Sequence, residues 1–178
     1  MPYTIFIDGS AGTTGLRILE RLQRRAADEP LTVRTLTGED RKDPDARAAA
    51  INASDAAILC LPDAAAREIL PRIRPEVRVL DTSTAHRTAP GWVYGLPELH
   101  GTRAALAEAR RVAVPGCHAT GFITLAAPLV ETGLLPADAA LTCTSLTGYS
   151  GGGKGMIADY RAPGRPAALE ACRPYGLG

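Results

Sequence analysis

The sequence predicts an α/β fold in which helices cover a doubly wound parallel sheet. Short runs rich in Val, Ile and Leu alternate with segments of helical period over the first half of the chain. This alternation is typical of consecutive βαβ units. The chain has 178 residues, of which 46% are hydrophobic and 22% charged, an ordinary composition for a globular protein. We expect one complete domain and part of another.

The elements follow in order along the chain. We expect five strands, at Tyr3–Asp8, Leu31–Thr37, Ala56–Leu61, Val77–Asp81 and Arg111–Val114. Apolar residues recur at helical spacing between the first two strands, at Leu16, Leu19, Leu22 and Ala26. Further helices are expected from Pro44, after Asp63 and over Thr102–Arg111.

The pattern changes after Cys117. Residues 119–135 predict a buried helix interrupted at Pro128, residues 140–149 a strand, and the SGGGKG of residues 150–155 a flexible loop. The remaining residues contain too little apolar material to close a second core. We therefore expect a domain over residues 1–116 and an incomplete one over residues 117–178, with the chain cut short inside it.

Charge and cysteine usage exclude several function classes. With 20 basic and 19 acidic residues the net charge is +1, so we expect no nucleic acid and no membrane surface as a partner, but a small molecule. No apolar run approaches the ~18 residues of a membrane span. The four cysteines form no C-x-x-C pair and no signal peptide precedes the first strand, which predicts free thiols in the cytoplasm. The three histidines lack zinc-ligand spacing, so no metal is expected.

A glycine-rich turn, GSAGTTG, links the first strand to the first helix. Gly9, Gly12 and Gly15 stand where a Rossmann-like domain receives a dinucleotide pyrophosphate, which backbone N–H groups and the helix dipole stabilise. The spacing is G-x-x-G-x-x-G rather than G-x-G-x-x-G, so a plain structural turn is the alternative. The candidate cofactor-binding residues of this turn are Gly9, Ser10, Gly12, Thr13, Thr14 and Gly15.

The end of the second strand predicts which nicotinamide cofactor binds. An acidic residue ~20 positions after the turn would hold a ribose 2′-hydroxyl, but Thr35 stands there. Thr35, Arg41 and the adjacent Lys42 suit a 2′-phosphate, which favours NADP (NADPH). Glu39 and Asp40 oppose this preference, and the loop is alternatively a solvated surface segment.

A second glycine-rich segment, GYSGGGKG, is close to a phosphate-binding P-loop. Gly155 stands where such a loop needs Ser or Thr for Mg²⁺, which argues against a nucleoside triphosphatase. Lys154 remains a candidate to bind a phosphate or carboxylate of a substrate.

Cys117 follows Pro115 and Gly116, which end a strand, and precedes small residues that fit the start of a helix. A helix N-terminus stabilises a thiolate, so Cys117 is either a nucleophile or one more buried sulfur. Cys60 and Cys143 lie within strand-like runs, where packing is favoured. A thiol that follows a redox-cofactor domain suggests covalent dehydrogenase chemistry through a thioester.

Several motifs resemble one family. GSAGTTG, CLPD, DTSTAHR, YGLPEL, PGCHATG and GYSGGGKGM occur in the order found in N-acetyl-γ-glutamyl-phosphate reductases of the shorter type, enzymes of arginine biosynthesis. The resemblance implies that Cys117 is acylated by an acyl phosphate substrate. It also implies that residues 117–178 begin an α+β substrate and dimerisation domain, and that the full-length protein is a homo-oligomer.

The chain departs from the family pattern at two positions. His118 replaces an aromatic residue, and the family's acid/base histidine, which follows a YGL segment, is missing because the chain stops at residues 174–178, PYGLG. His118 is a poor substitute base, and His86 and His100 read as surface residues in loops. Ser83, Arg87 and Lys154 are the candidate substrate-binding residues.

Two alternatives stay open. The first is a reductase of a related acyl phosphate, as in the aspartate-semialdehyde or lysine pathways. The second is a non-catalytic nucleotide-binding fragment, because the histidine is missing.

Overall fold

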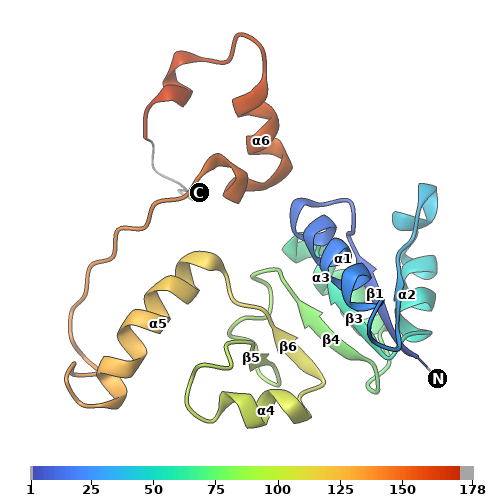
Figure 1. The fold of residues 1–178 in the computed structure, drawn as a ribbon, viewed down its shortest axis with the longest axis horizontal. Helices are drawn as coiled ribbons and strands as arrows, with labels where there is room; N and C mark the ends of the chain where they lie inside the picture. Colours follow the sequence, from blue (N-terminus) through green and yellow to red (C-terminus); the bar gives the residue numbers. More distant parts are fainter. Residues whose placement is uncertain (1, 173–178) are drawn as a thin grey trace. The chain divides into compact units, whose positions relative to one another are not determined.

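The computed structural model describes residues 2–172. The chain forms two compact units, Met1–Cys143 and Thr144–Gly178, which are described separately. The first unit is built on a sheet with helices against its faces (Figure 1). The PYGLG segment of residues 174–178 lies outside the described residues.

The sheet is parallel throughout and has the strand order β2-β1-β3-β4-β6-β5. Its strands are β1 (Tyr3–Asp8), β2 (Leu31–Arg34), β3 (Ala56–Leu59), β4 (Arg78–Asp81), β5 (Val93–Tyr94) and β6 (Arg111–Ala113). The predicted doubly wound sheet is confirmed. β2 and β3 end earlier than expected, and the two-residue β5, paired with β6, was not expected.

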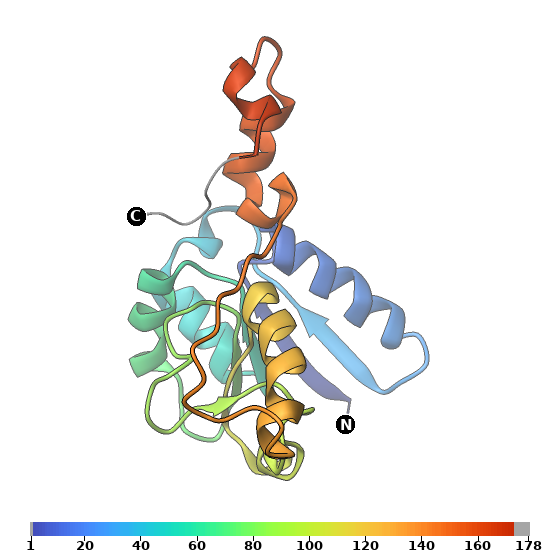
Figure 2. The same cartoon turned by 90° about the vertical axis from the view of Figure 1, so that its left-hand side faces the viewer.

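Helices cover both faces of this sheet. They are α1 (Thr13–Arg25), α2 (Pro44–Asn52), α3 (Asp63–Ile69) and α4 (Thr102–Glu108), with short 3₁₀ helices η1 (Gly38–Arg41) and η2 (Leu70–Arg72). α1 lies on one side of the sheet, with α2 and α3 on the other (Figure 2). Right-handed crossovers require this arrangement when one connection moves towards one edge of the sheet and the next connections move towards the other edge. Asp43 caps α2 by accepting a hydrogen bond from the N–H of Asp45 at 2.9 Å.

The core lies between the sheet and the α2 and α3 face. Its buried side chains are Phe6, Ile51, Ala57, Leu59, Ile69, Ile73, Val77 and Val79. The α1 face is less covered, because Gly15 is the buried residue of that helix and Leu16 is 52% exposed. The regularly spaced leucines of α1 therefore predicted the helix correctly, but they are not buried in a core on this face of the sheet.

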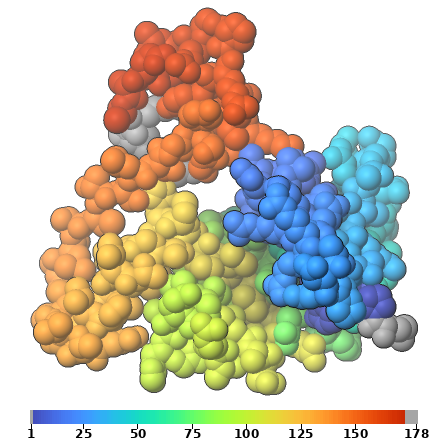
Figure 3. All heavy atoms as spheres, in the orientation of Figure 1, coloured from blue at the N-terminus to red at the C-terminus, as the bar shows by residue number. Residues whose placement is uncertain are grey.

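Helix α5 (Cys117–Glu131) follows β6 and differs from the expected buried, broken helix. It continues through Pro128, whose carbonyl accepts from the N–H of Thr132 at 3.1 Å and from its Oγ1 at 2.8 Å. None of its residues is buried, and Phe122, Leu125 and Leu129 are exposed. The helix is drawn in yellow at the surface in Figure 3.

The strand expected over residues 140–149 is wrong. Residues 139–148 are irregular, and no described strand pairs with them. Leu141 and Leu146 are 50% and 88% exposed, so the segment has neither the pairing nor the burial that would hold a strand. Cys143 is consequently exposed rather than packed in a strand.

The second unit is helical within its described part. It contains η3 (Tyr149–Gly152), α6 (Gly153–Arg161) and η4 (Ala167–Glu170). The glycine run predicted to be a flexible loop instead forms η3 and begins α6, and the rings of Tyr149 and Tyr160 stack at 5.0 Å across it. Over residues 2–172, no helix combines the length and apolar character needed to cross a membrane.

Candidate functional site

The predicted site residues of the first unit gather at the carboxyl ends of its strands. The glycine turn follows β1, Cys60 follows β3, residues 82–87 follow β4, and residues 114–117 follow β6. β1 and β3 lie side by side in the sheet, and the strands that follow them are added on opposite sides: β2 next to β1, and β4 next to β3. Ligands bind outside the strand ends at such a switch point in open α/β sheets.

The glycines of the turn have different structural requirements. Gly9 has φ +80°, and a Cβ there would lie 2.2 Å from the carbonyl oxygen of Cys60. A Cβ on Gly15 would lie 2.4 Å from the carbonyl oxygen of Gly9. Gly12, the N-cap of α1, has ordinary φ, and its Cβ would meet that same oxygen at 3.4 Å. The fold thus requires Gly9 and Gly15, whereas Gly12 leaves room for a ligand to approach the backbone.

A hollow of about 210 Å³ opens beside this turn. Its lining includes Gly9 and Ser10 from the turn, and Arg41 and Lys42 from the segment that follows β2. Glu39 and Asp40 are absent from the lining residues, but Nζ of Lys42 lies 3.4 Å from a carboxylate oxygen of Glu39. Thr35 is not among the lining residues either, and Thr13 and Thr14 form the first turn of α1.

Asp8, the last residue of β1, is the one carboxylate that lines the hollow. It forms a buried ion pair with Arg47 of α2, whose Nη2 lies 2.9 Å from Oδ2 and whose Nε donates to the same oxygen at 3.0 Å. The pair neutralises the carboxylate next to the predicted phosphate site. Sequence reasoning missed it, because a single Arg in a predicted helix reads as a surface charge.

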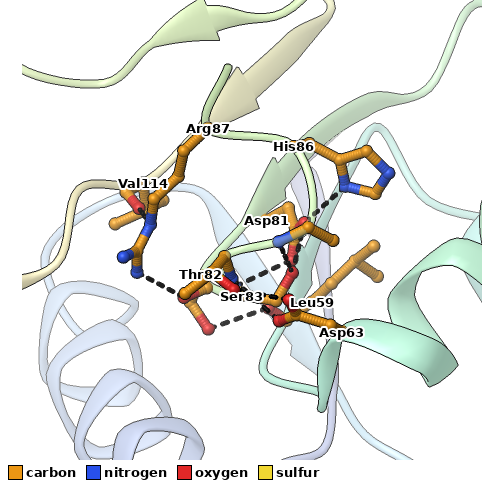
Figure 4. Close-up of polar contacts among 10 residues, drawn as sticks. Leu59, Asp63, Asp81, Thr82, Ser83, His86, Arg87 and Val114 are labelled. Atoms are coloured by element: carbon orange, nitrogen blue, oxygen red, sulfur yellow. Dashed lines mark hydrogen bonds and ion pairs between the residues drawn. The ribbon is translucent and has the colours of Figure 1, made fainter. Parts of the chain in front are cut away.

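A second buried carboxylate, Asp81, organises the loop after β4 (Figure 4). Its side chain is fully buried and accepts from the N–H of Ser83 at 3.0 Å and from Ser83 Oγ at 2.7 Å. Nδ1 of His86 lies 2.6 Å from Oδ2 of Asp81. The hydroxyl of Ser83, predicted to bind substrate, thus donates its hydrogen bond to Asp81. It also accepts a hydrogen bond from the N–H of Ala85 at 3.2 Å.

His86 is not the surface residue that the sequence predicts. It is 6% exposed, and its ring stacks on Trp92 with centroids 4.3 Å apart and an interplanar angle of 8°. The burial arises from Asp81 and Trp92, which no local pattern around His86 reveals. His100, by contrast, is exposed as expected.

Arg87 joins the loop after β4 to the turn that carries Cys117. Its Nε donates to the carbonyl oxygen of Val114 at 3.2 Å, and its Nη2 donates to that of Thr82 at 3.3 Å. A Cβ on Gly116 would lie 2.7 Å from Nη1. Gly116 has φ −81°, so its backbone conformation does not call for glycine, whereas a side chain there would displace the Arg87 guanidinium.

Cys117 is the first residue of α5 and is exposed, with Gly116 as N-cap. The helix dipole stabilises negative charge at such a position. Burial raises the pKa of Cys60 to about 11, an effect that a hydrogen bond with Thr82 opposes. The raised pKa favours the protonated form of the Cys60 thiol, which is the less nucleophilic one.

The remaining candidates lie elsewhere. Lys154 belongs to the second unit, where it is exposed in the first turn of α6. The position at which the family's histidine would follow YGL lies outside the described residues. Within residues 2–172, no group of three or more His, Cys, Asp or Glu side chains is arranged to hold a metal ion.

Two family models match the chain. The model described as semialdehyde dehydrogenase, NAD binding domain, matches residues 4–109. The model described as semialdehyde dehydrogenase, dimerisation domain, matches residues 117–178.

Curated relatives match nearly the whole chain. The N-acetyl-gamma-glutamyl-phosphate reductase 2 of Pseudomonas putida is 52% identical over 97% of this chain and 55% of its own length. The N-acetyl-gamma-glutamyl-phosphate reductase of Burkholderia ambifaria is 51% identical over 97% of this chain and 54% of its own. The chain spans about half the length of these relatives.

Solved structures share the fold. An aspartate semialdehyde dehydrogenase from Francisella tularensis superposes with a TM-score of 0.62 at 13% identity, over 88% of this chain and 48% of that chain. Aspartate semialdehyde dehydrogenase II from Vibrio cholerae gives 0.61 at 16% identity, over 96% and 53%. At these identities the likeness establishes the architecture alone.

Proposed function

Because the chain belongs to the semialdehyde dehydrogenase family, we propose that its full-length protein reduces N-acetyl-γ-glutamyl phosphate to the semialdehyde and phosphate in arginine biosynthesis. The relatives that match at about 50% identity over 97% of the chain carry that activity in their names. A nicotinamide cofactor fits the family's NAD-binding domain.

The observation that carries this proposal is the position of Cys117. Its thiol is exposed at the N-terminus of α5, next to the glycine against which Arg87 lies. The Cys117 thiolate attacks the acyl carbon, the bond from that carbon to the phosphate oxygen breaks, and phosphate leaves. A nicotinamide held at the glycine turn of residues 9–15 would supply the hydride that reduces the thioester carbon, and Cys117 would leave as the thiolate as the aldehyde is released.

Arg87 and Ser83 are proposed to bind the substrate, and Lys154 is proposed independently as a substrate-binding residue. Two carbonyl oxygens fix the Arg87 guanidinium, and its remaining N–H groups can bind the anionic part of an acyl phosphate. The hydroxyl of Ser83 donates its proton to Asp81, so it would contact the substrate by accepting a hydrogen bond from it.

The cofactor is proposed to be NADPH. Arg41 and Lys42 line the hollow beside the glycine turn, and Arg47 neutralises the one carboxylate in that lining. Because Lys42 pairs with Glu39 at 3.4 Å, the guanidinium of Arg41 is the group that supports a 2′-phosphate. The cofactor residues are those of the turn, Gly9, Ser10, Gly12, Thr13, Thr14 and Gly15, together with Thr35 and Arg41.

The domain boundary is proposed at residue 116, where the β6 strand has ended and the thiol-bearing helix begins. The dimerisation-domain match over residues 117–178 supports a homo-oligomer as the full-length form. The four free cysteines agree with a reducing cytoplasm.

The test is a coupled measurement of NADPH oxidation by the full-length protein with two substrates. We expect turnover with N-acetyl-γ-glutamyl phosphate and at least about a hundredfold lower kcat/KM with aspartyl phosphate. Preference for aspartyl phosphate would assign the related reductase instead. Binding of NADPH without turnover of either substrate would favour a non-catalytic nucleotide-binding protein.

A further inference from the structure

We infer that His86, held between Asp81 and Trp92, is a positioning residue that sets the placement of Arg87 against Gly116, the residue that precedes Cys117. The inference rests on the proposed function for its consequence in turnover. Whether His86 holds the Arg87 guanidinium at Gly116 is tested separately, by labelling the Cys117 thiol.

The loop after β4 has two differently anchored halves (Figure 4). In the first half, Thr82 Oγ1 donates to the carbonyl oxygen of Leu59 at 3.0 Å. Thr84 is bound by the carboxylate of Asp63, to which its N–H donates at 2.9 Å. These contacts fix residues 82–84 and leave the second half to be held by other groups.

His86 anchors the second half. Its Nδ1 lies 2.6 Å from Oδ2 of Asp81, and its ring stacks on Trp92, which packs against the core. With Asp81 ionised, Nδ1 carries the proton and donates it. A ring held both at its edge and on its face fixes the backbone at residue 86, from which Arg87 starts.

Arg87 carries this placement to the thiol. Its Nε and Nη2 reach carbonyl oxygens from two different segments, at Val114 and Thr82, and Nη1 lies where a Cβ of Gly116 would be. Both hydrogen bonds form only while the backbone at residue 87 stays within reach of the two carbonyl oxygens. Displacement of residue 86 would therefore move the positive charge away from the residue adjacent to Cys117.

Two substitutions separate the two anchors. His86→Asn keeps a donor at the place of Nδ1 but removes the stacked ring, whereas His86→Phe keeps the ring and removes the donor. His100→Phe is the matched control, because His100 is exposed in a turn. Circular dichroism and NADPH binding establish that each variant is folded.

The readout compares alkylation of Cys117 by anionic iodoacetate and neutral iodoacetamide in the full-length protein. A nearby guanidinium accelerates the anionic reagent selectively, and Cys143, exposed in the same chain, is the internal reference. We expect His86→Phe to lower the iodoacetate-to-iodoacetamide rate ratio at Cys117 by about threefold to fivefold. The ratio at Cys143 should not change, and His100→Phe should keep the ratio at Cys117. His86→Asn, which loses the stacked ring but keeps a donor, should lower the ratio at Cys117 less than His86→Phe does.

Turnover provides the second readout. His86→Phe should raise the KM for the acyl phosphate at least about tenfold while the Kd for NADPH is unchanged. An unchanged rate ratio and KM in folded His86→Phe would overturn the inference, even if its unfolding temperature falls. Loss of turnover in Cys117→Ser with normal kinetics in His86→Phe would refute this inference alone, whereas normal turnover in Cys117→Ser would refute the proposed function.

Discussion

Arg47 of α2 and Asp8 of β1 form an ion pair whose side chains are only 7% and 5% exposed, with Nη2 2.9 Å from Oδ2. Asp8 immediately precedes the glycine turn and lines the hollow beside it. The relationship places a neutralised carboxylate, rather than a free one, next to the proposed phosphate site. It has consequences for both stability and charge.

Removing one member of this pair should destabilise the protein strongly. Arg47→Met leaves Asp8 buried without a counter-charge, which costs about 3–5 kcal/mol in the free energy of unfolding. Asp8→Asn combined with Arg47→Met should recover much of that loss, as measured by urea denaturation. Arg24→Met, which breaks the exposed pair with Glu20 at 2.6 Å, should cost less than about 1 kcal/mol. Equal costs for Arg47→Met and Arg24→Met would contradict the structural role of the pair.

Two glycines of the turn should respond differently to alanine. Gly12→Ala should change the unfolding free energy by only about 1 kcal/mol, because its Cβ meets the Gly9 oxygen at 3.4 Å. It should nevertheless weaken NADPH binding at least about tenfold, since the Cβ occupies the approach to the backbone. Gly15→Ala, with its Cβ 2.4 Å from the same oxygen, should destabilise the fold by about 1–3 kcal/mol or more. Wild-type NADPH affinity in Gly12→Ala would show that the turn does not hold the cofactor.

Cofactor preference should depend on Arg41. Arg41→Ala removes a guanidinium that lines the hollow, so the Kd for NADPH should rise about tenfold or more while the Kd for NADH stays the same. Fluorescence titration of both cofactors measures this, with Arg21→Ala on the exposed part of α1 as control. A parallel loss for NADH and NADPH would mean that Arg41 does not recognise the 2′-phosphate.

Thiol labelling should separate Cys60 from the other cysteines. Burial raises the pKa of Cys60 to about 11, so near pH 8 only about one thiol in a thousand is ionised. Cys60 should escape iodoacetamide in the folded protein and react once urea unfolds it, while the exposed Cys143 and Cys172 react in both states. Because the pKa is raised, this protection should decline as the pH rises toward 11. Peptide mass spectrometry that finds Cys60 labelled as fast as Cys143 near pH 8 would refute it.

The sequence predicted the elements whose signal is local. β1 matches its expected bounds because its apolar run ends at a glycine turn, and α2 begins at Pro44 because Asp43 caps it. The position of Cys117 at the start of a helix followed from Pro115 and Gly116. These features depend on neighbouring residues in the chain.

The features that sequence reasoning missed depend on distant partners. His86 is buried because Asp81 and Trp92 enclose it, and Arg47 is buried because Asp8 lies opposite. The expected strand over residues 140–149 had β-branched residues but no strand to pair with in the described part of the chain. A β propensity without a partner edge does not determine a strand.

The most direct test of the account is the detection of the acyl group on Cys117. The full-length protein is incubated with N-acetyl-γ-glutamyl phosphate without NADPH, quenched in acid, and digested for mass spectrometry. We expect the peptide that contains Cys117 to gain the mass of N-acetylglutamate minus one water, and this increase to disappear when NADPH is added before quenching. A Cys117→Ser protein that still oxidises NADPH with this substrate, or an acyl group found on another cysteine, would contradict it.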